Sequence, residues 1–268
     1  VRGGWAFGHV VARFGMEIAI KKAKDLEVAV VSVGQTHHIG RLGHYSEMAA
    51  AEGMISMVWA GGMGAEKPAA VPYGGSKPIF HTNPIAIGLP TGREAPIIVD
   101  FATSATAGVK VINAYNRNEK LALNCIVDKD GNSTTDPKDF MEGGAHLPFG
   151  GHKGYALMLV TEFLGRIFSG ADDGAKCDYS EPLFRRHGVT MIVFRADLFQ
   201  PFSSYAQRAD KMVQCVREVP PAPGFQEVLL PGIPEDRAQA YRQENGIPIA
   251  DDIWEAIGET ALSLGVTV

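Results

Sequence analysis

The segment that most restricts the fold runs from residue 26 to residue 60 and places an alanine-rich run between two apolar, strand-like runs. Their lengths and compositions predict a strand, a helix and a second strand, over residues 26–33, 44–52 and 54–60. The loop before the helix contains Gly40 and Gly43. Glycine lets a backbone approach a ligand closely, and the free N–H groups at a helix N-terminus attract anions. The segment therefore predicts a βαβ-like unit with a candidate ligand loop.

The rest of the chain predicts further strands and helices, so the class is mixed α/β. Helices are expected over residues 7–24 and 102–115, buried strands over 85–89, 96–101 and 189–194, and an irregular polar stretch over 128–150. A long amphipathic helix follows residue 150, with an apolar stripe formed by Leu157, Val160, Phe163, Leu164, Ile167 and Phe168. The proline-rich residues 220–234 end the main body, and one or two helices are expected over residues 235–268.

Composition excludes several classes of protein. The 268 residues are 46% hydrophobic and 21% charged, which is typical of a folded globular protein. The net charge is −5 without a basic stripe, so no nucleic-acid partner is expected. No apolar run approaches the ~18 residues of a membrane-spanning helix, so no membrane partner is expected. Cys125, Cys177 and Cys215 form no CxxC pair, which predicts a reducing compartment, the cytoplasm.

Two nucleotide-binding signatures are missing from the sequence. The fragment Gly62-Met63-Gly64 begins like a dinucleotide fingerprint, but Lys67 stands in the place of its third glycine. The sequence also contains no P-loop and no GxSxG nucleophile motif. A Rossmann fold and a serine hydrolase are therefore not expected.

Residues 150–154, Gly-Gly-His-Lys-Gly, are the strongest local indication of a ligand. They open the predicted amphipathic helix, where the helix dipole opposes a cation such as Lys153. An anion held between the lysine ammonium and the free backbone N–H groups explains this arrangement better than a simple turn does. His38, which precedes Gly40 and Gly43, is a second candidate, and for it a ligand role and a packing role carry equal weight.

Several motifs, in order, make the chain resemble the malate/L-lactate dehydrogenase-like oxidoreductases. The matching segments are Thr-His-His-Ile-Gly-Arg-Leu-Gly-His-Tyr at 36–45, Thr-Asn-Pro at 82–84, Asp-Phe-Ala-Thr-Ser at 100–104, Thr-Asp-Pro at 135–137, Gly-His-Lys-Gly-Tyr at 151–155 and Pro-Gly at 231–232. The form of the first segment is most similar to the hydroxycarboxylate dehydrogenase branch. The resemblance spans almost the whole chain.

The resemblance implies a fold that composition does not reveal. It implies an α/β (α+β) protein whose cofactor domain is not a Rossmann fold but a mixed, largely antiparallel sheet with helices. We assign residues 1–225 to this domain. Residues 226–268 are assigned to the C-terminal helical part of a second, discontinuous domain that is built from both chain ends. Homodimers, with active sites near the dimer interface, are also implied.

The resemblance further implies an NAD(P)-dependent enzyme that transfers a hydride between a nicotinamide dinucleotide and a small 2-hydroxyacid or 2-oxoacid, such as malate or lactate. NAD is preferred to NADP as the expected cofactor. Thr82 is implied to contact the substrate. The implied cofactor contacts are His38, Ile39, Gly40, Arg41, Leu42, Asp100, Phe101, Ala102, His152, Lys153, Gly154, Pro231 and Gly232.

Departures from the family pattern leave the catalytic acid open. The family's acid/base histidine lies in a His-Ser-His-Gly motif that would precede Val1, so we expect further residues there, and His38 is the second choice. His81 replaces the usual glycine before Thr82, and Lys110 stands where some members carry an acidic residue. One alternative is a protein that binds the dinucleotide without catalysis. Another is a metal-dependent lyase built on His37, His38 and His44, although we expect no metal.

Overall fold

The computed structural model describes residues 1–62, 69–171 and 187–266. They form two compact units, Val1–Pro231 and Gly232–Val268. The sequence-based boundary, between residues 225 and 226, lies slightly earlier in the chain than this division.

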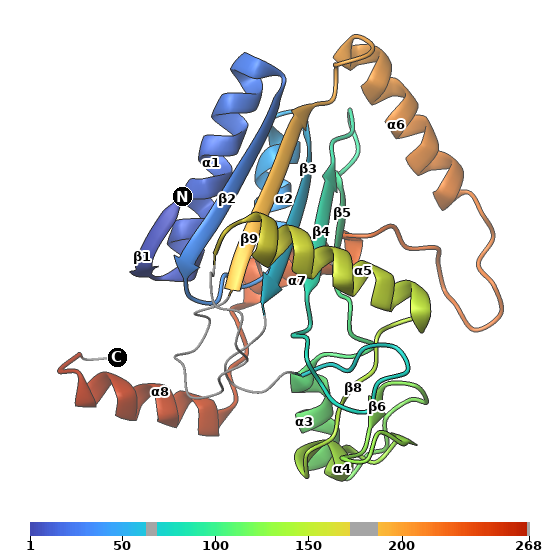
Figure 1. Cartoon of the computed structure of the whole chain (residues 1–268). Coiled ribbons are helices and arrows are strands. Elements are labelled where there is room, and N and C mark those ends of the chain that lie inside the picture. Colours follow the sequence, from blue (N-terminus) through green and yellow to red (C-terminus); the bar gives the residue numbers. More distant parts are fainter. Residues whose placement is uncertain (63–68, 172–186, 267–268) are drawn as a thin grey trace. The chain divides into compact units, whose positions relative to one another are not determined.

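A six-stranded sheet forms the centre of the first unit (Figure 1). Only the first pair of strands is parallel, and the other four pairs are antiparallel. The predicted mixed, largely antiparallel sheet is therefore confirmed. The spatial order of the strands is β1 (Arg2–Ala6), β2 (Val28–Thr36), β9 (His187–Arg195), β3 (Met54–Gly62), β4 (Pro84–Leu89) and β5 (Ile97–Ala102).

Helices cover both faces of this sheet. On one face, α1 (Gly8–Leu26) packs against β2 and β9, and α2 (Gly43–Ala51) packs against β3, β4 and β5. On the other face, α5 (His152–Glu162) continues into the π-helix η1 (Phe163–Phe168), and the two cross β4, β3 and β9 (Figure 1). Alternating apolar residues on the strands and the buried faces of α1 and α2 supply the main core, which includes Met16, Val33, Tyr45, Val58 and Met191.

The predicted βαβ-like unit is present as β2, α2 and β3. The two strands are not neighbours, however, because β9 lies between them and is antiparallel to both. Met191 of β9 is opposite Val31 on one side and Val58 on the other. A strand from far along the chain thus completes the core of the local unit.

The remaining elements of the first unit correct two predictions. The helix expected over 102–115 begins only at Gly108, because residues 103–105 form backbone hydrogen bonds with residues 147–149 instead. The stretch 128–150 is also more regular than expected. Its elements and their neighbours are α3 (Gly108–Asn116), β6 (Ile126–Val127), β7 (Ser133–Thr134), α4 (Pro137–Met141) and β8 (Ala145–His146), and α6 (Phe202–Arg217) follows β9.

The apolar stripe predicted for the helix after residue 150 does not face the core. Phe163 is 54% exposed and Ile167 is 49% exposed, and Val160 and Phe168 are exposed as well. The buried face instead carries Met158, Thr161, Glu162 and Gly165. Polar groups are tolerated on this face because they form hydrogen bonds within the protein, as described below.

The second unit consists of two helices, α7 (Ile233–Asn245) and α8 (Asp251–Ser263). They are separated by residues 246–250, close to the break that the sequence predicts at Asn-Gly-Ile-Pro. Neither these helices nor any other helix among the described residues is long and apolar enough to cross a membrane.

Candidate active site

The strand directions bring distant predicted site segments to one end of the sheet. Because β9 is antiparallel to β2 and β3, and β4 is antiparallel to β3 and β5, the C-terminal ends of β2 and β5 lie at the same end as the N-terminus of β4. Residues 38–42 follow β2, Thr82 precedes β4, and residues 100–102 end β5. We call this end, formed around Thr36, Thr82 and Ala102, the site end.

Asp100 and Arg41 meet at the N-terminus of α2. The Gly43 N–H donates a hydrogen bond to Asp100 Oδ2 at 2.7 Å, and Arg41 Nε lies 3.8 Å from the same oxygen. Arg41 Nη1 also pairs with Glu47 Oε1 at 2.6 Å. The guanidinium is therefore already balanced by two carboxylates, which lie on strand β5 and helix α2.

Contacts within the loop of residues 38–42, and with helices α1 and α2, fix its conformation. Gly40 adopts a φ of +71°, and its N–H donates a hydrogen bond to His38 Nδ1 at 3.2 Å. A Cβ at this position would lie 2.3 Å from Nε2 of His9 on α1. The Tyr45 hydroxyl donates to the Ile39 carbonyl at 2.5 Å, and burial raises the pKa of Tyr45 to about 12. The glycine is thus required by backbone conformation and packing.

His81, next to Thr82, lies close to two further histidines, His146 and His187. The Thr82 hydroxyl oxygen lies 3.3 Å from His81 Nδ1, and burial, with a smaller effect from His38, lowers the pKa of His81. Burial and nearby His81 lower the pKa of His146 to about 4. The same burial effect, with His81 and His38, lowers the pKa of His187 to about 3. Near neutral pH these buried imidazoles are therefore uncharged.

The start of α5 fits an anionic ligand. His152 and Lys153 are exposed at its first turn, and no side chain of the described residues caps its N-terminus. The Phe149 carbonyl lies so close to Gly154 that an added Cβ would come within 1.8 Å of it. The Phe149 N–H donates to the Thr103 carbonyl at 3.0 Å, which ties this turn to the end of β5. Free N–H groups and an exposed ammonium form the donor set that binds phosphates.

The remaining predicted contacts are more scattered. Phe101 packs edge to face against Phe149, with ring centroids 5.3 Å apart, and Ala102 is the last residue of β5. The Pro231 carbonyl accepts the Ile98 N–H at 3.1 Å, which places Pro231 beside the outer edge of β5. Gly232 begins the second unit, where it precedes α7 with a φ of +101°. Leu42 and Ile39 are buried in the main core.

The described residues contain no group of three His, Cys, Asp or Glu side chains that could hold a metal ion. His37, His38 and His44, the set considered for a metal-dependent lyase, therefore do not converge into such a group. Lys110 is exposed on α3. Residues 63–67, which contain most of the incomplete glycine fingerprint, and Cys177 lie outside the described residues.

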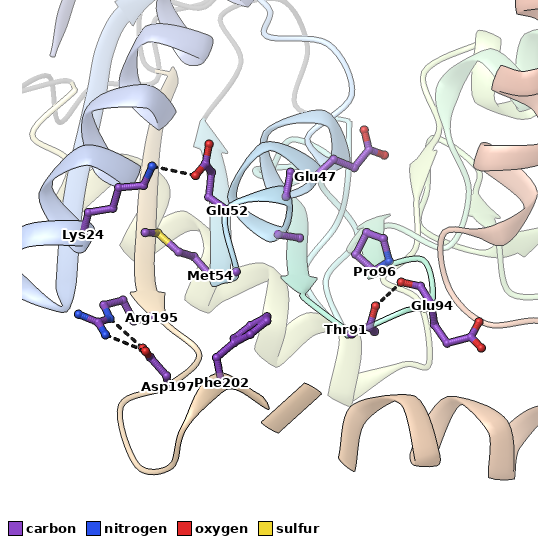
Figure 2. Close-up of a pocket in the computed structure, with 14 residues that line it drawn as sticks. Lys24, Glu47, Glu52, Met54, Thr91, Glu94, Pro96, Arg195, Asp197 and Phe202 are labelled. Atoms are coloured by element: carbon purple, nitrogen blue, oxygen red, sulfur yellow. Dashed lines mark hydrogen bonds and ion pairs between the residues drawn. The ribbon is translucent and has the colours of Figure 1, made fainter. Parts of the chain in front are cut away.

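A separate pocket opens at the opposite end of the sheet (Figure 2). Its volume is about 750 Å³, and its wall includes the ends of α1, α2 and β9. Four of the charged side chains on this wall form two pairs with one another. Lys24 Nζ lies 2.7 Å from Glu52 Oε2, and Arg195 binds Asp197 through two hydrogen bonds. Because residues 38–42, Thr82 and residues 100–102 gather at the site end instead, the candidate active site lies there.

Sequence reasoning missed the buried partners of the site. His146 and His187 belong to none of the motifs, and their closeness to His81 depends on strands β8 and β9. Asn83 was noted only as part of a motif, although it is completely buried next to Thr82. An asparagine between a threonine and a proline at a strand start is a weak local signal, and only its partners reveal its role.

Solved structures with the same fold are dehydrogenases. The structure of a sulfolactate dehydrogenase from Methanocaldococcus jannaschii matches with a TM-score of 0.87 and 34% identity, over 99% of this chain and 75% of that chain. The structure of a malate dehydrogenase from Pyrococcus horikoshii OT3 matches with a TM-score of 0.84 and 30% identity, over 99% and 73%. The fold and the site together define a dehydrogenase with a sheet unlike that of Rossmann enzymes.

The chain belongs to the malate/L-lactate dehydrogenase family, whose model matches residues 1–258. L-sulfolactate dehydrogenase of M. jannaschii is 35% identical over 270 residues, which are 100% of this chain and 76% of the relative. Hydroxycarboxylate dehydrogenase B of Escherichia coli (strain K12) is 33% identical over 271 residues, with 98% and 73% covered. The predicted family is confirmed, and so is the predicted class, an oxidoreductase of the small-hydroxyacid dehydrogenases, which work with a nicotinamide cofactor.

Proposed function

We propose that the protein transfers a hydride between NAD and a small 2-hydroxyacid, the corresponding 2-oxoacid being the product. The match to hydroxyacid dehydrogenases over nearly the whole chain carries this proposal. The convergence of the motif residues at the site end supports it. Malate, lactate, sulfolactate and related hydroxycarboxylates are the candidate substrates, because the relatives' names refer to them.

The dinucleotide is held by the segments that meet at the site end. Lys153 and the first N–H groups of α5 bind its phosphates, and His152 lies beside them on the same turn. The loop of residues 38–42 and residues 100–102 line the rest of the cofactor, and Pro231, whose carbonyl accepts the Ile98 N–H, is a further proposed contact. When bound, the nicotinamide accepts or supplies the hydride. The protein's own task is to hold the reacting carbon against it and to exclude water.

Thr82 orients the substrate, and an imidazole accepts the proton of the substrate hydroxyl during oxidation and returns it during reduction. Imidazole suits this role near neutral pH. The family's acid/base histidine is our first choice and His38 is the second. If His38 contacts only the cofactor, the His38→Ala variant shows a raised cofactor KM and a measurable kcat. A collapse of kcat with unchanged cofactor binding identifies His38 as the acid instead.

NAD is the proposed cofactor because of the charges around Arg41. Its guanidinium pairs with Glu47 at 2.6 Å and lies 3.8 Å from Asp100. These three side chains carry a net negative charge, which repels the 2′-phosphate of NADP but not the 2′-hydroxyl of NAD. A lower Kd for NADPH than for NADH contradicts this assignment.

The assembly and the compartment are also proposals. The exposed apolar side chains of α5 and η1, together with Val28 and Val30 on β2, form a surface suited to a homodimer contact. Cys125 and Cys215 are free thiols, which fits a reducing cytoplasm.

Steady-state kinetics on purified protein tests the function. L-malate, L-lactate and L-sulfolactate are each offered with NAD, and absorbance at the NADH band reports the hydride transfer. Turnover of at least one of them is the expected result. Tight NADH binding without turnover of any hydroxyacid supports the alternative, a dinucleotide-binding protein that lacks catalysis. Absence of both binding and turnover overturns the proposal.

A further inference from the structure

Asn83 is buried directly after Thr82, and its backbone adopts a φ of +41°. Its amide Nδ2 donates hydrogen bonds to the Met158 carbonyl at 3.1 Å and to Glu162 Oε2 at 3.0 Å. Both partners are acceptors, so the amide nitrogen must face them. These bonds join the segment that precedes β4 to the second half of α5.

The Glu162 carboxylate is held on its other side by Arg166, one turn further along the same helix. Glu162 is 3% exposed. A buried carboxylate is stable only when it is paired and hydrogen-bonded, and here a guanidinium and the Asn83 amide satisfy it. Asn83 therefore binds a charged, immobile partner, and such hydrogen bonds are stronger than neutral ones.

The Thr82–Asn83 backbone is also held by Thr103, which follows β5. The Thr103 N–H donates to the Thr82 carbonyl at 2.9 Å, and the Thr103 hydroxyl donates to the Asn83 carbonyl at 2.9 Å. Thr103 directly follows the predicted cofactor contacts at the end of β5. Asn83 thus stands between three segments of the candidate active site: Thr82, the end of β5, and α5.

We propose that Asn83 is a positioning residue, which holds Thr82 at a fixed place relative to the cofactor-binding turn of α5. This inference rests on the proposed function, because it assigns Thr82 to the substrate and His152 and Lys153 to the cofactor. The buried ion pair of Glu162 and Arg166 gives the Asn83 side chain a fixed hydrogen-bond partner. Small displacements of a substrate contact lower the rate strongly, because the reacting atoms must be aligned.

The test compares Asn83→Gly with Glu162→Gln in the purified protein. Glycine accepts a φ of +41° without strain, so Asn83→Gly removes the side-chain bonds and leaves the backbone conformation accessible. Glu162→Gln keeps an oxygen that can accept from Asn83 but loses the charge. Thr161→Val is the matched control. Thr161 is equally buried on α5, and its hydroxyl donates only to the Leu157 carbonyl of the same helix, at 2.8 Å.

We expect Asn83→Gly to raise the KM of the hydroxyacid about tenfold and to lower kcat by a similar factor. The Kd of NADH, measured by fluorescence titration, should change by less than about threefold, because the phosphate-binding turn keeps its own backbone contacts. Glu162→Gln should show the same pattern about threefold more weakly, since it keeps the hydrogen bond. Thr161→Val should leave KM and kcat close to those of the wild type.

Two results overturn the inference. One is an active wild-type protein in which Asn83→Gly and Thr161→Val have the same KM and kcat, which assigns Asn83 to stability alone. The other is a parallel loss of NADH binding and turnover in Asn83→Gly, which indicates general disruption of the site. A wild-type protein that turns over no hydroxyacid contradicts the proposed function itself, and this inference with it. Thermal unfolding of each variant confirms that the proteins compared are folded.

Discussion

The Asp100 carboxylate of strand β5 accepts a hydrogen bond from the Gly43 backbone N–H, so a residue 57 positions away caps helix α2. Leu42, at the N-cap position, has no side-chain group that can do this. The contact fixes the helix and the loop of residues 38–42 to the end of β5. If Asp100 also lines the cofactor, as we propose, this carboxylate links the stability of α2 to cofactor binding.

Two substitutions of Asp100 should show how much of its contribution to stability comes from the hydrogen bond to the Gly43 N–H and how much from its negative charge. Asp100→Ala removes the cap, and the free energy of unfolding should fall by about 1–2 kcal/mol. Asp100→Asn keeps an oxygen for the Gly43 N–H, so its loss should be about half as large or less. Urea denaturation at pH 7 measures both. Equal losses in the two variants would show that the charge facing Arg41, and not the hydrogen bond, stabilises the helix.

Lys153 should contribute to the affinity for the dinucleotide and not to the stability of the fold. It is exposed on the first turn of α5, so Lys153→Ala should leave the melting temperature almost unchanged. The loss of a charge-assisted hydrogen bond to phosphate should weaken NADH binding by about 1.5–3 kcal/mol. Fluorescence titration gives the Kd, and Lys21→Ala, an exposed lysine on α1, is the control. Unchanged affinity in Lys153→Ala would refute the phosphate-binding assignment.

Gly154 should tolerate no side chain, with or without cofactor. An added Cβ would lie 1.8 Å from the Phe149 carbonyl, and backbone cannot move aside cheaply. Gly154→Ala should lower the free energy of unfolding by about 1–3 kcal/mol or more. Gly258→Ala in α8, where an added methyl group meets no atom of its own unit within 4 Å, should raise it by about 0.5–1 kcal/mol. Similar effects at both positions would contradict the close contact.

His146 should make stability depend on pH. Its pKa is lowered to about 4 in the folded protein, chiefly by burial, while the unfolded chain retains a value near 6.5. Between these values the unfolded state binds more protons, so the free energy of unfolding falls as the pH drops from about 7 to about 4. The contribution of His146 is on the order of 3 kcal/mol.

The His146→Phe variant tests this dependence, because an aromatic ring of similar size has no proton to bind. Denaturation between pH 4 and pH 8 should show a flatter pH profile for the variant than for the wild type. Above pH 7.5 the difference between the two proteins should be constant. A wild-type profile that the substitution leaves unchanged would assign the acid sensitivity to other groups, such as His187.

A charge on the exposed face of η1 should prevent the proposed homodimer. Phe163 and Ile167 are about half exposed, and burying a new carboxylate at a subunit contact is costly. Light scattering should give about twice the mass of one subunit for the wild type and the mass of one subunit for Phe163→Asp or Ile167→Asp. Phe199→Asp, at a phenylalanine that is 98% exposed, should remain dimeric. A monomeric wild-type protein contradicts the proposal directly.

Local order along the chain was predictable because it depends on neighbouring residues. The strand, loop, helix and strand between residues 26 and 60 appear as predicted, and so do the two helices after residue 232. The periodicity of the helix after residue 150 correctly grouped Val160, Phe163 and Ile167 on one face. It could not show which face is buried, and hydrogen bonds to Glu162 place the core on the other side.

The sequence by itself determined the family, the dehydrogenase class and the motif residues, since each of these is carried by short runs of neighbouring residues. Only the tertiary structure decided that β9 separates β2 from β3, that Asp100 caps α2, and that Asn83 joins Thr82 to Glu162. Such pairings connect residues far apart in the chain. They depend on how strands align and on which buried polar groups must satisfy one another, and no local pattern encodes either.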